Sequence, residues 1–196
     1  MKTGAFFFRS FLAVDVPQTV TREIQVLTDS LKKAGADVKW VEPQNLHLTL
    51  KFLGDLDGER LSQVKDFLDQ FCPAKAAFPI RFSELGGFPD LRAPKVLWVG
   101  LAEGEESLKT LAAGLESGLA EIGFEKSEKP FSAHLTIGRV RSPKGLGRLA
   151  EAVKVENYSS VQAVRVDHII FYKSTLTREG PIYESIHTTP FLKEKR

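Results

Sequence analysis

Two hydrophobic periodicities alternate along this chain, one typical of strands and one typical of helices. Runs rich in Val, Ile, Leu and Phe, bounded by turn residues, predict β-strands over residues 6–16, 38–41, 46–54, 78–88, 96–101, 130–140, 161–172 and 182–187. Apolar residues at spacings of three and four predict helices over residues 17–35, 57–72, 108–123 and 146–153. The elements fall into two similar halves, which indicates an α+β fold and not a doubly wound parallel sheet. We expect residues 1–196 to form a single domain with two lobes.

Each half contains one strand in which a histidine precedes a threonine by two residues. The first motif is His47-Leu48-Thr49-Leu50 and the second is His134-Leu135-Thr136-Ile137. Because successive side chains of a strand point to opposite faces, each histidine shares a face with its threonine. In the first strand Lys51 is expected on that face too. The opposite face is apolar, and its packed residues would be Leu46, Leu48, Leu50 and Phe52.

Composition and charge restrict the possible functions without selecting one. The net charge of +2 is compatible with a small anionic ligand or an RNA end, but is too weak to indicate wrapping of long nucleic acid. The single cysteine, Cys72, excludes an intramolecular disulfide and a multi-cysteine metal site, and its apolar surroundings predict a packed thiol. No apolar run is long enough to span a bilayer, so we expect a soluble, cytoplasmic protein without a membrane partner. The charged tail at residues 193–196 is expected to be solvated.

The two histidines and two threonines together provide the groups needed to cleave a phosphodiester. Histidine exchanges protons near neutral pH, because its reference pKa is about 6.5, so one imidazole can act as general base while the other acts as general acid. A threonine hydroxyl beside each imidazole can donate a hydrogen bond to a phosphoryl oxygen. The sequence contains no glycine-rich phosphate loop, so these side chains would have to bind the phosphate themselves. The reaction would then need no metal.

Other interpretations of the histidines are open at this level. A lone His-x-Thr on a strand more often marks an exposed polar face than a site, and His187-Thr188-Thr189 repeats the pattern near the end of the chain. We interpret His187 as structural or surface-exposed, and His168, which follows Asp167, as a hydrogen-bonded histidine of the fold. The histidines of the two motifs could instead be metal ligands, although no further ligand pattern accompanies them.

Two basic residues near the motifs could add positive charge beside a phosphate, or could simply lie on a solvated face. These are Lys51 and Arg139. Strict alternation points Arg139 away from His134 and Thr136. A bulge or a strand end at Gly138 would be needed to turn Arg139 back, so its role is left open.

The chain resembles the 2H phosphoesterase superfamily, and in particular its RNA 2′,3′-cyclic phosphodiesterase branch, also called the 2′-5′ RNA ligase family. The two His-x-Thr-x tetrapeptides look like the superfamily signature. The likeness covers most of the chain, through residues 9–17, 40–41, 45–54, 87–89, 96–100, 134–139 and 180–183. One departure is Ala133, where the family usually has proline, and this should alter only local backbone rigidity.

The resemblance implies a bilobal 2H phosphoesterase fold, with two pseudo-symmetric antiparallel-sheet lobes, helices on the outside and a central cleft. It implies hydrolysis of a terminal RNA 2′,3′-cyclic phosphate to a 2′-phosphomonoester without a metal or other cofactor. His47 would donate a proton to the leaving 3′ oxygen and His134 would accept one from water, although the residues alone do not assign these roles. Lys51, Phe88 and Arg139 would bind the substrate, either an RNA end or a small cyclic nucleotide. We expect a monomer.

Two other functions are compatible with the same residues. Running the step backwards, with a 5′-hydroxyl in place of water, would ligate RNA halves through a 2′-5′ linkage. A noncatalytic module that binds an RNA end or a nucleotide is the third possibility. Binding alone, however, would not require a paired acid and base.

Overall fold

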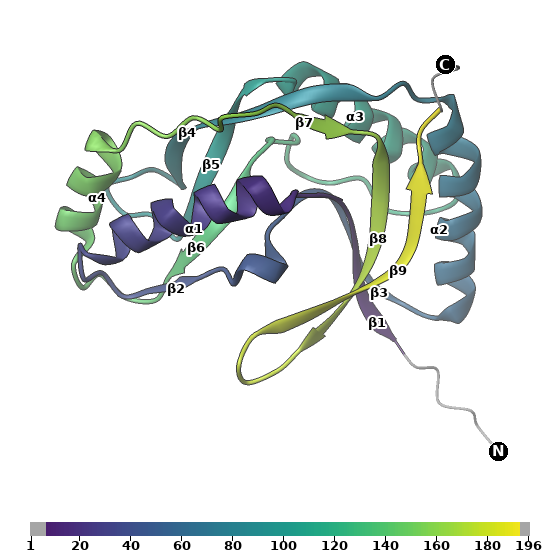
Figure 1. Ribbon diagram of the computed structural model, residues 1–196. Coiled ribbons are helices and arrows are strands. Elements are labelled where there is room, and N and C mark those ends of the chain that lie inside the picture. The colour runs from purple at the N-terminus through teal and green to yellow at the C-terminus, as the bar shows by residue number, and fades with distance from the viewer. Residues whose placement is uncertain (1–6, 193–196) are drawn as a thin grey trace.

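Two antiparallel sheets form the framework of the protein. The computed structural model describes residues 7–192 (Figure 1), so the predicted start of the first strand at Phe6 and the tail at 193–196 lie outside the described residues. The four-stranded sheet has the order β3 (His47–Leu56), β1 (Phe8–Asp15), β8 (His168–Leu176) and β9 (Pro181–Pro190). The five-stranded sheet has the order β2 (Val38–Trp40), β6 (Leu135–Val140), β5 (Val96–Glu103), β4 (Phe78–Phe88) and β7 (Val164–Val166). All these strand pairs are antiparallel, which confirms the predicted α+β class.

The four predicted helices are present within residues 7–192. They are α1 (Gln18–Lys32), α2 (Gly58–Phe71), α3 (Glu105–Glu121) and α4 (Leu146–Val155), and two short 3₁₀ turns occupy Pro43–Asn45 (η1) and Cys72–Ala74 (η2). Local signals set their ends: α1 begins after Pro17, and the side chain of Asp57 accepts a hydrogen bond from the backbone N–H of Arg60 at the start of α2. Cys72 is fully buried after α2, as predicted, and burial raises the pKa of its thiol to about 12.

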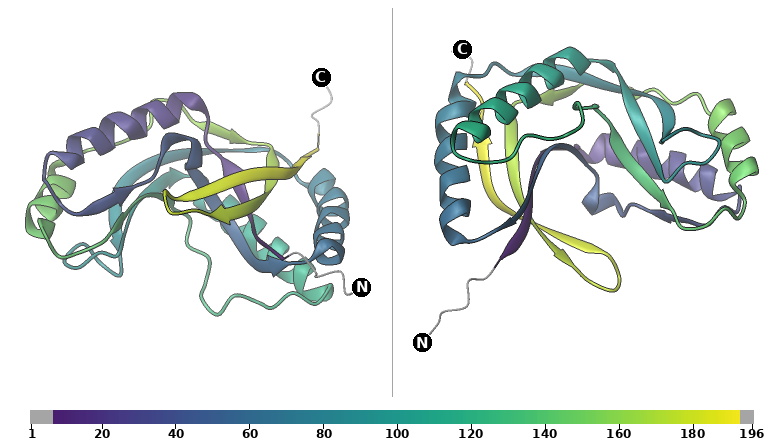
Figure 2. Two further views of the ribbon diagram at one scale, coloured as in Figure 1. Left: turned by 90° about the horizontal axis from the view of Figure 1, so that it is seen from below. Right: turned by 180° about the vertical axis from the view of Figure 1, so that it is seen from behind.

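Two helices cross between the sheets. Helix α1 follows β1 of the four-stranded sheet but lies beside the five-stranded sheet, where it contacts α4 (Figure 1). Helix α3 follows β5 of the five-stranded sheet but lies beside the four-stranded sheet and contacts β3 (Figure 2). Buried apolar side chains from both sheets and all four helices consequently form one connected core. This exchange holds the two sheets together.

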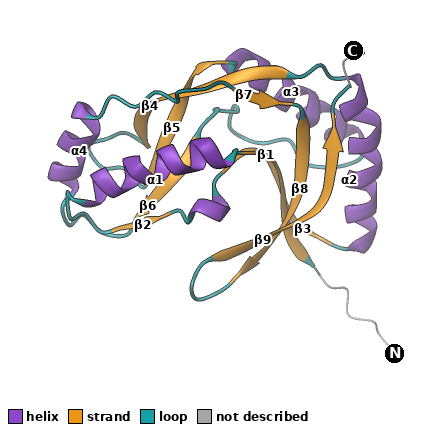
Figure 3. Cartoon of the chain, in the orientation of Figure 1, coloured by secondary structure: helices purple, strands orange, loops and turns teal. Residues whose placement is uncertain are grey.

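The predicted strand over residues 161–172 was wrong in one respect. It is divided into β7 and β8, which belong to different sheets and are separated only by Asp167 (Figure 3). Val166 and Ile169 are both fully buried, so the apolar run continues across the point where the chain changes sheet. Hydrophobic periodicity therefore gave no sign of the break.

Each motif strand contains one extra residue directly after its threonine. Between β1 and β3, Ala13 pairs with Thr49 and Leu12 pairs with Lys51, so Leu50 has no partner on β1. Between β5 and β6, Trp98 pairs with Thr136 and Leu97 pairs with Gly138, so Ile137 is skipped in the same way. Such β-bulges reverse the alternation of the side chains that follow them. The sequence of buried and exposed positions is consequently the same in 48–53 and 135–140.

Candidate active site

The two motif histidines are oriented by the same backbone contact. Nδ1–H of His47 donates to the carbonyl oxygen of Asn45 over 2.7 Å, and Nδ1–H of His134 donates to that of Ser132 over 2.8 Å. A carbonyl can only accept a hydrogen bond, so Nδ1 must carry the proton in each neutral ring. Nε2 is then the unprotonated nitrogen of each imidazole. It can accept a proton, or donate one after the ring is charged.

In the structure His47, His134 and Arg139 are close enough for their charges to affect one another. Burial lowers the pKa of both histidines, and the hydrogen bonds to the backbone carbonyls oppose that effect only in part. The positive charge of Arg139 lowers both pKa values further, and the charge of His134 also lowers the pKa of His47. Strands β3 and β6 are in contact, although they belong to different sheets. Burial and the charge of Arg139 therefore favour the neutral form of both imidazoles.

The bulge after Thr136 explains the position of Arg139. Because Ile137 is the extra residue, Arg139 returns to the face of His134 and Thr136, from which strict alternation would have excluded it. The bulge is thus at Ile137 and not at Gly138. Arg139 is exposed, and its guanidinium has no hydrogen bond or ion pair with any residue in 7–192.

The matching bulge in β3 overturns two predictions. Lys51 does not share the face of His47: it is only 4% exposed, and its Nζ donates to Oε1 of Glu116 over 2.8 Å and to the carbonyl of Glu125 over 2.9 Å. Phe52, predicted to pack in the core, is 63% exposed. Leu50, the extra residue, moves Lys51 to the core side and Phe52 to the histidine side. Lys51 is therefore a buried structural cation, and its place in the substrate site was a wrong prediction.

Aromatic rings surround His47. The ring of Phe11 lies 4.8 Å from the imidazole and that of Tyr183 lies 5.1 Å away, edge-on, as centroid distances. Phe11 also contacts Phe52 at 6.1 Å and Tyr172 at 5.2 Å. Our prediction from the sequence missed this aromatic face, because alternation assigned Phe52 to the core. An exposed ring beside a phosphate-binding site is a surface on which a nucleobase can stack.

His134 has fewer aromatic neighbours. Phe88, one of the predicted substrate residues, is half-buried and contacts the imidazole edge-on at a centroid distance of 5.0 Å. Phe88 also packs on Trp98 at 5.3 Å. Thr49 and Thr136 are partly exposed residues, and neither hydroxyl has a hydrogen-bond partner among residues 7–192. Each is thus available to a ligand.

The two remaining histidines take part in the fold, as predicted. Nε2 of His168 lies 3.1 Å from Oδ1 of Asp15, and its Nδ1 lies 2.7 Å from Oδ1 of Asp167. Nε2 of His187 lies 2.7 Å from Oδ1 of Asp69 on α2. Both histidines are therefore held by carboxylates of the fold.

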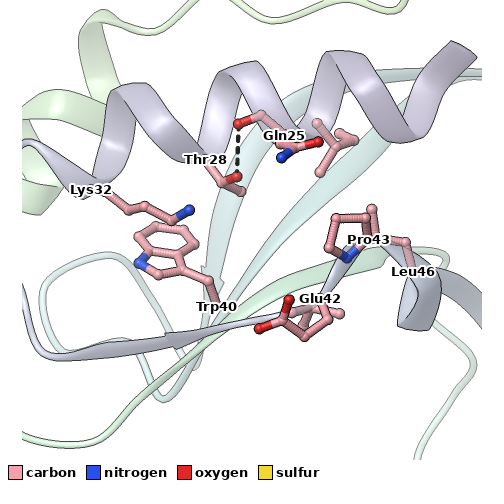
Figure 4. A pocket seen from close by; sticks show the side chains of 9 residues that line it. Gln25, Thr28, Lys32, Trp40, Glu42, Pro43 and Leu46 are labelled. Atoms are coloured by element: carbon pink, nitrogen blue, oxygen red, sulfur yellow. Dashed lines mark hydrogen bonds between the residues drawn. The ribbon is translucent and has the colours of Figure 1, made fainter.

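A small pocket lies elsewhere in the molecule. It has a volume of about 100 Å³ and lies between α1, β2 and η1 (Figure 4), where Thr28 donates a hydrogen bond to the carbonyl of Gln25. None of the predicted site residues lines it. Among residues 7–192, no group of three or more His, Cys, Asp or Glu side chains is arranged to hold a metal ion. Within the same residues, no helix is long and apolar enough to cross a membrane.

The internal repeat seen in the two motif strands extends over most of the chain. The family described as LigT-like phosphoesterase matches it twice in succession, over residues 14–98 and 99–183. This protein belongs to the LigT-like phosphoesterase family. Each copy of the family pattern supplies one crossing helix and one His-x-Thr motif. The predicted phosphoesterase is thus confirmed.

Several relatives of this LigT-like phosphoesterase are similar over nearly their whole length. The RNA 2′,3′-cyclic phosphodiesterase of Methanothermobacter thermautotrophicus is 35% identical over 175 residues, covering 89% of this chain and 94% of the relative. The enzyme of the same name from Methanocaldococcus jannaschii is 36% identical over 180 residues, covering 91% and 98%. The crystal structure of the Thermus thermophilus protein TT0787 has a TM-score of 0.80 at 26% identity, covering 93% of this chain and 97% of that one. These similarities confirm the 2H phosphoesterase fold expected from the sequence.

Proposed function

We propose that this phosphoesterase hydrolyses the 2′,3′-cyclic phosphate at an RNA end to a 2′-phosphomonoester, without a metal, by acid–base catalysis between His47 and His134. The observation that carries the proposal is the pair of imidazoles, each with Nδ1 bound to a backbone carbonyl so that Nε2 is the nitrogen that can exchange a proton. The two strands that these histidines begin or precede, β3 and β6, are in contact. The names of the relatives from the two methanogens support the same substrate. Both histidines come from one chain, so a monomer would be sufficient.

The neighbouring groups fit the charge that such a reaction develops. A cyclic phosphate carries one negative charge, which the exposed guanidinium of Arg139 can neutralise with two parallel hydrogen bonds. The hydroxyls of Thr49 and Thr136 can donate to the nonbridging oxygens as the phosphorus becomes five-coordinate. Phe88, in edge-on contact with His134, would limit the orientations of that imidazole and border the bound phosphate.

The surroundings of the two histidines favour different roles for them. The exposed Phe52 and the rings of Phe11 and Tyr183 lie on the His47 side, so the nucleoside would bind there by stacking. The leaving group is the 3′ oxygen of that nucleoside. His47 is therefore assigned as the acid that protonates it, and His134 as the base that activates water on the other side.

The proton and bond changes in the step balance. The oxygen of water forms a bond to phosphorus while Nε2 of neutral His134 takes its proton. His47 must take up a proton on Nε2 from solvent before the step. As the bond between phosphorus and the 3′ oxygen breaks, this proton moves to that oxygen. The products are a 2′-phosphomonoester and a 3′-hydroxyl. Solvent then restores the starting protonation of both rings.

Substitution of the two histidines tests this function. We expect His47→Ala and His134→Ala each to lower kcat on adenosine 2′,3′-cyclic phosphate about 10²- to 10⁴-fold, because each removes one proton transfer. His187→Asn is the matched control, since this histidine binds Asp69 outside the site and should retain activity. Thermal unfolding of each variant would verify the fold. Full activity in either alanine variant would contradict the mechanism.

Treatment with a chelator tests the metal-free part of the proposal. Activity on the same substrate should be unchanged after incubation with EDTA and removal of the chelator. A loss that one particular divalent ion restores would revive the interpretation of the histidines as metal ligands. In the same preparation, labelled RNA halves would reveal whether a 2′-5′ ligation product also forms.

A further inference from the structure

A second arginine lies on the same face of the four-stranded sheet as His47. Arg9 and Phe11 are two residues apart on β1, and β1 pairs with β8 without interruption from Arg9 to Ala13. Alternation therefore gives Arg9 and Phe11 the same face. The ring of Phe11 contacts the imidazole of His47, so this is the face of the catalytic histidine.

The guanidinium of Arg9 is exposed and has no partner within the described part of the chain. It forms no hydrogen bond or ion pair with any residue in 7–192, although Asp55 is its register partner on β3. Arg139, which we also place beside the histidines, likewise has no such partner among the residues that the structure describes. An unpaired guanidinium on an aromatic surface is a typical site for a phosphate of a nucleic acid backbone.

The charges of both cations reach Tyr183. Arg9, Ser174 and Tyr183 are opposite one another across β1, β8 and β9, so their side chains share a face. Burial raises the pKa of the Tyr183 hydroxyl, and the charges of both Arg139 and Arg9 act on it in the opposite direction. The aromatic face thus has one guanidinium at the histidines and another beyond the rings. Along β1, Arg9 lies ~6.6 Å past Phe11, away from the motif end.

We propose that Arg9 binds the phosphodiester on the 5′ side of the terminal nucleotide, so that the site is built for the end of an RNA chain and not for a cyclic mononucleotide. This inference rests on the proposed function, which places the cyclic phosphate at Arg139 and the terminal base on the aromatic face. The chain then leaves the terminal ribose through its 5′ oxygen. The next phosphate of the RNA chain, attached to this 5′ oxygen, would lie beyond the rings of Phe11 and Tyr183. Arg9 is the cation on that part of the face.

Three substrates that differ only at the 5′ oxygen test the role of Arg9. They are adenosine 2′,3′-cyclic phosphate, the same nucleoside with an added 5′-phosphate, and a dinucleotide that ends in a 2′,3′-cyclic phosphate. In the unmodified protein, kcat/KM should be at least about tenfold higher for the two substrates with a 5′ phosphate. Arg9→Gln should bring this ratio close to one, mainly by raising KM for the two substrates with a 5′ phosphate. Arg9→Lys should restore part of it, because a lysine keeps the charge but not the fork of donors.

Controls separate this inference from the proposed function. Arg22→Gln changes an exposed arginine on α1 and should leave all three rates unchanged. For the dinucleotide, the slope of log kcat/KM against log salt concentration should become shallower by about one in Arg9→Gln only, because one phosphate contact is lost. If Arg9→Gln lowers all three rates equally, or none, the inference is wrong while the phosphodiesterase function stands. If the unmodified protein hydrolyses none of the substrates, the proposed function itself fails.

Discussion

At the scale of single residues, one inserted residue in each motif strand determines which side chains lie on the face of the motif histidines. Leu50 in β3 and Ile137 in β6 occupy equivalent positions after the threonines. Beyond them, β3 presents an aromatic ring and β6 presents a guanidinium, so two nearly identical motifs differ in chemistry. The same insertion turns Lys51 into the core, where a charge must be paired to be tolerated.

Lys51 provides a prediction about stability. Lys51→Met removes the cation from a buried pair, and Glu116 keeps only its hydrogen bonds from Ser127. We expect the free energy of unfolding to fall by about 1–3 kcal/mol, below the usual loss for a buried pair because Glu116 is partly exposed. Urea denaturation would measure it. Lys126→Met changes an exposed lysine between Glu125 and Ser127 and should have little effect. Equal losses of stability in both variants would contradict the buried role of Lys51.

At the scale of the elements, β4 and β5 pack closely because of a glycine. Gly86 pairs with Trp98, and a Cβ on Gly86 would lie only 2.1 Å from the nearest atom of the indole ring. The indole in turn packs on Phe88, which contacts His134. A change at this glycine therefore acts on the ring that borders the candidate site.

Gly86→Ala should destabilise the protein by about 1–3 kcal/mol, because the indole has to leave its position or the strands have to separate. Gly147→Ala on α4 is the matched control, since a Cβ there would meet nothing within 4 Å. That change should be neutral or slightly stabilising. Both can be compared by urea denaturation, and equal stability of the two variants would show that the close packing at Gly86 carries no energetic weight.

At the scale of the whole molecule, His168 links two places where the chain passes from one sheet to the other. This residue begins β8, directly after the chain has left β7 of the other sheet, and Asp15 ends β1 just before α1 crosses. The hydrogen bond from His168 to Asp15 raises the pKa of the imidazole to about 9; burial opposes this, and the bond to Asp167 adds to it. The charged imidazole thus joins two segments that connect the sheets.

This ion pair predicts a dependence of stability on pH. A histidine whose pKa is raised by folding stabilises the native state fully below the unfolded pKa of about 6.5 and loses that contribution as the pH rises through about 9. We expect the free energy of unfolding to fall by about 2 kcal/mol between pH 6.5 and 9.5. This figure is reduced because solvent screens the two half-exposed carboxylates. Denaturation at both pH values would measure it. His168→Gln should abolish this part of the pH dependence, and an unchanged slope in the variant would refute the assignment.

The four helices, most of the strands and both motifs could be predicted from local sequence alone. Apolar spacing along α1 placed Val20, Ile24, Leu27 and Leu31 in the core, because helix periodicity depends only on the local chain. The pairing of each histidine with its threonine was likewise local, since both precede the bulge. His168 was assigned to the fold because it follows Asp167, and His187 because it lacks the flanking leucines of the motifs.

Which side chains join the histidines depends on how the strands pair and pack in three dimensions. A bulge exists through the pairing of a strand with its partner, so Lys51, Phe52 and Arg139 could not be placed from alternation. The division between β7 and β8 was hidden for a similar reason, because both strands are buried in different sheets. The approach of the two motifs depends on helices that cross from one sheet to the other. Local periodicity carries no information about such long-range contacts, which are set by the packing of the shared core.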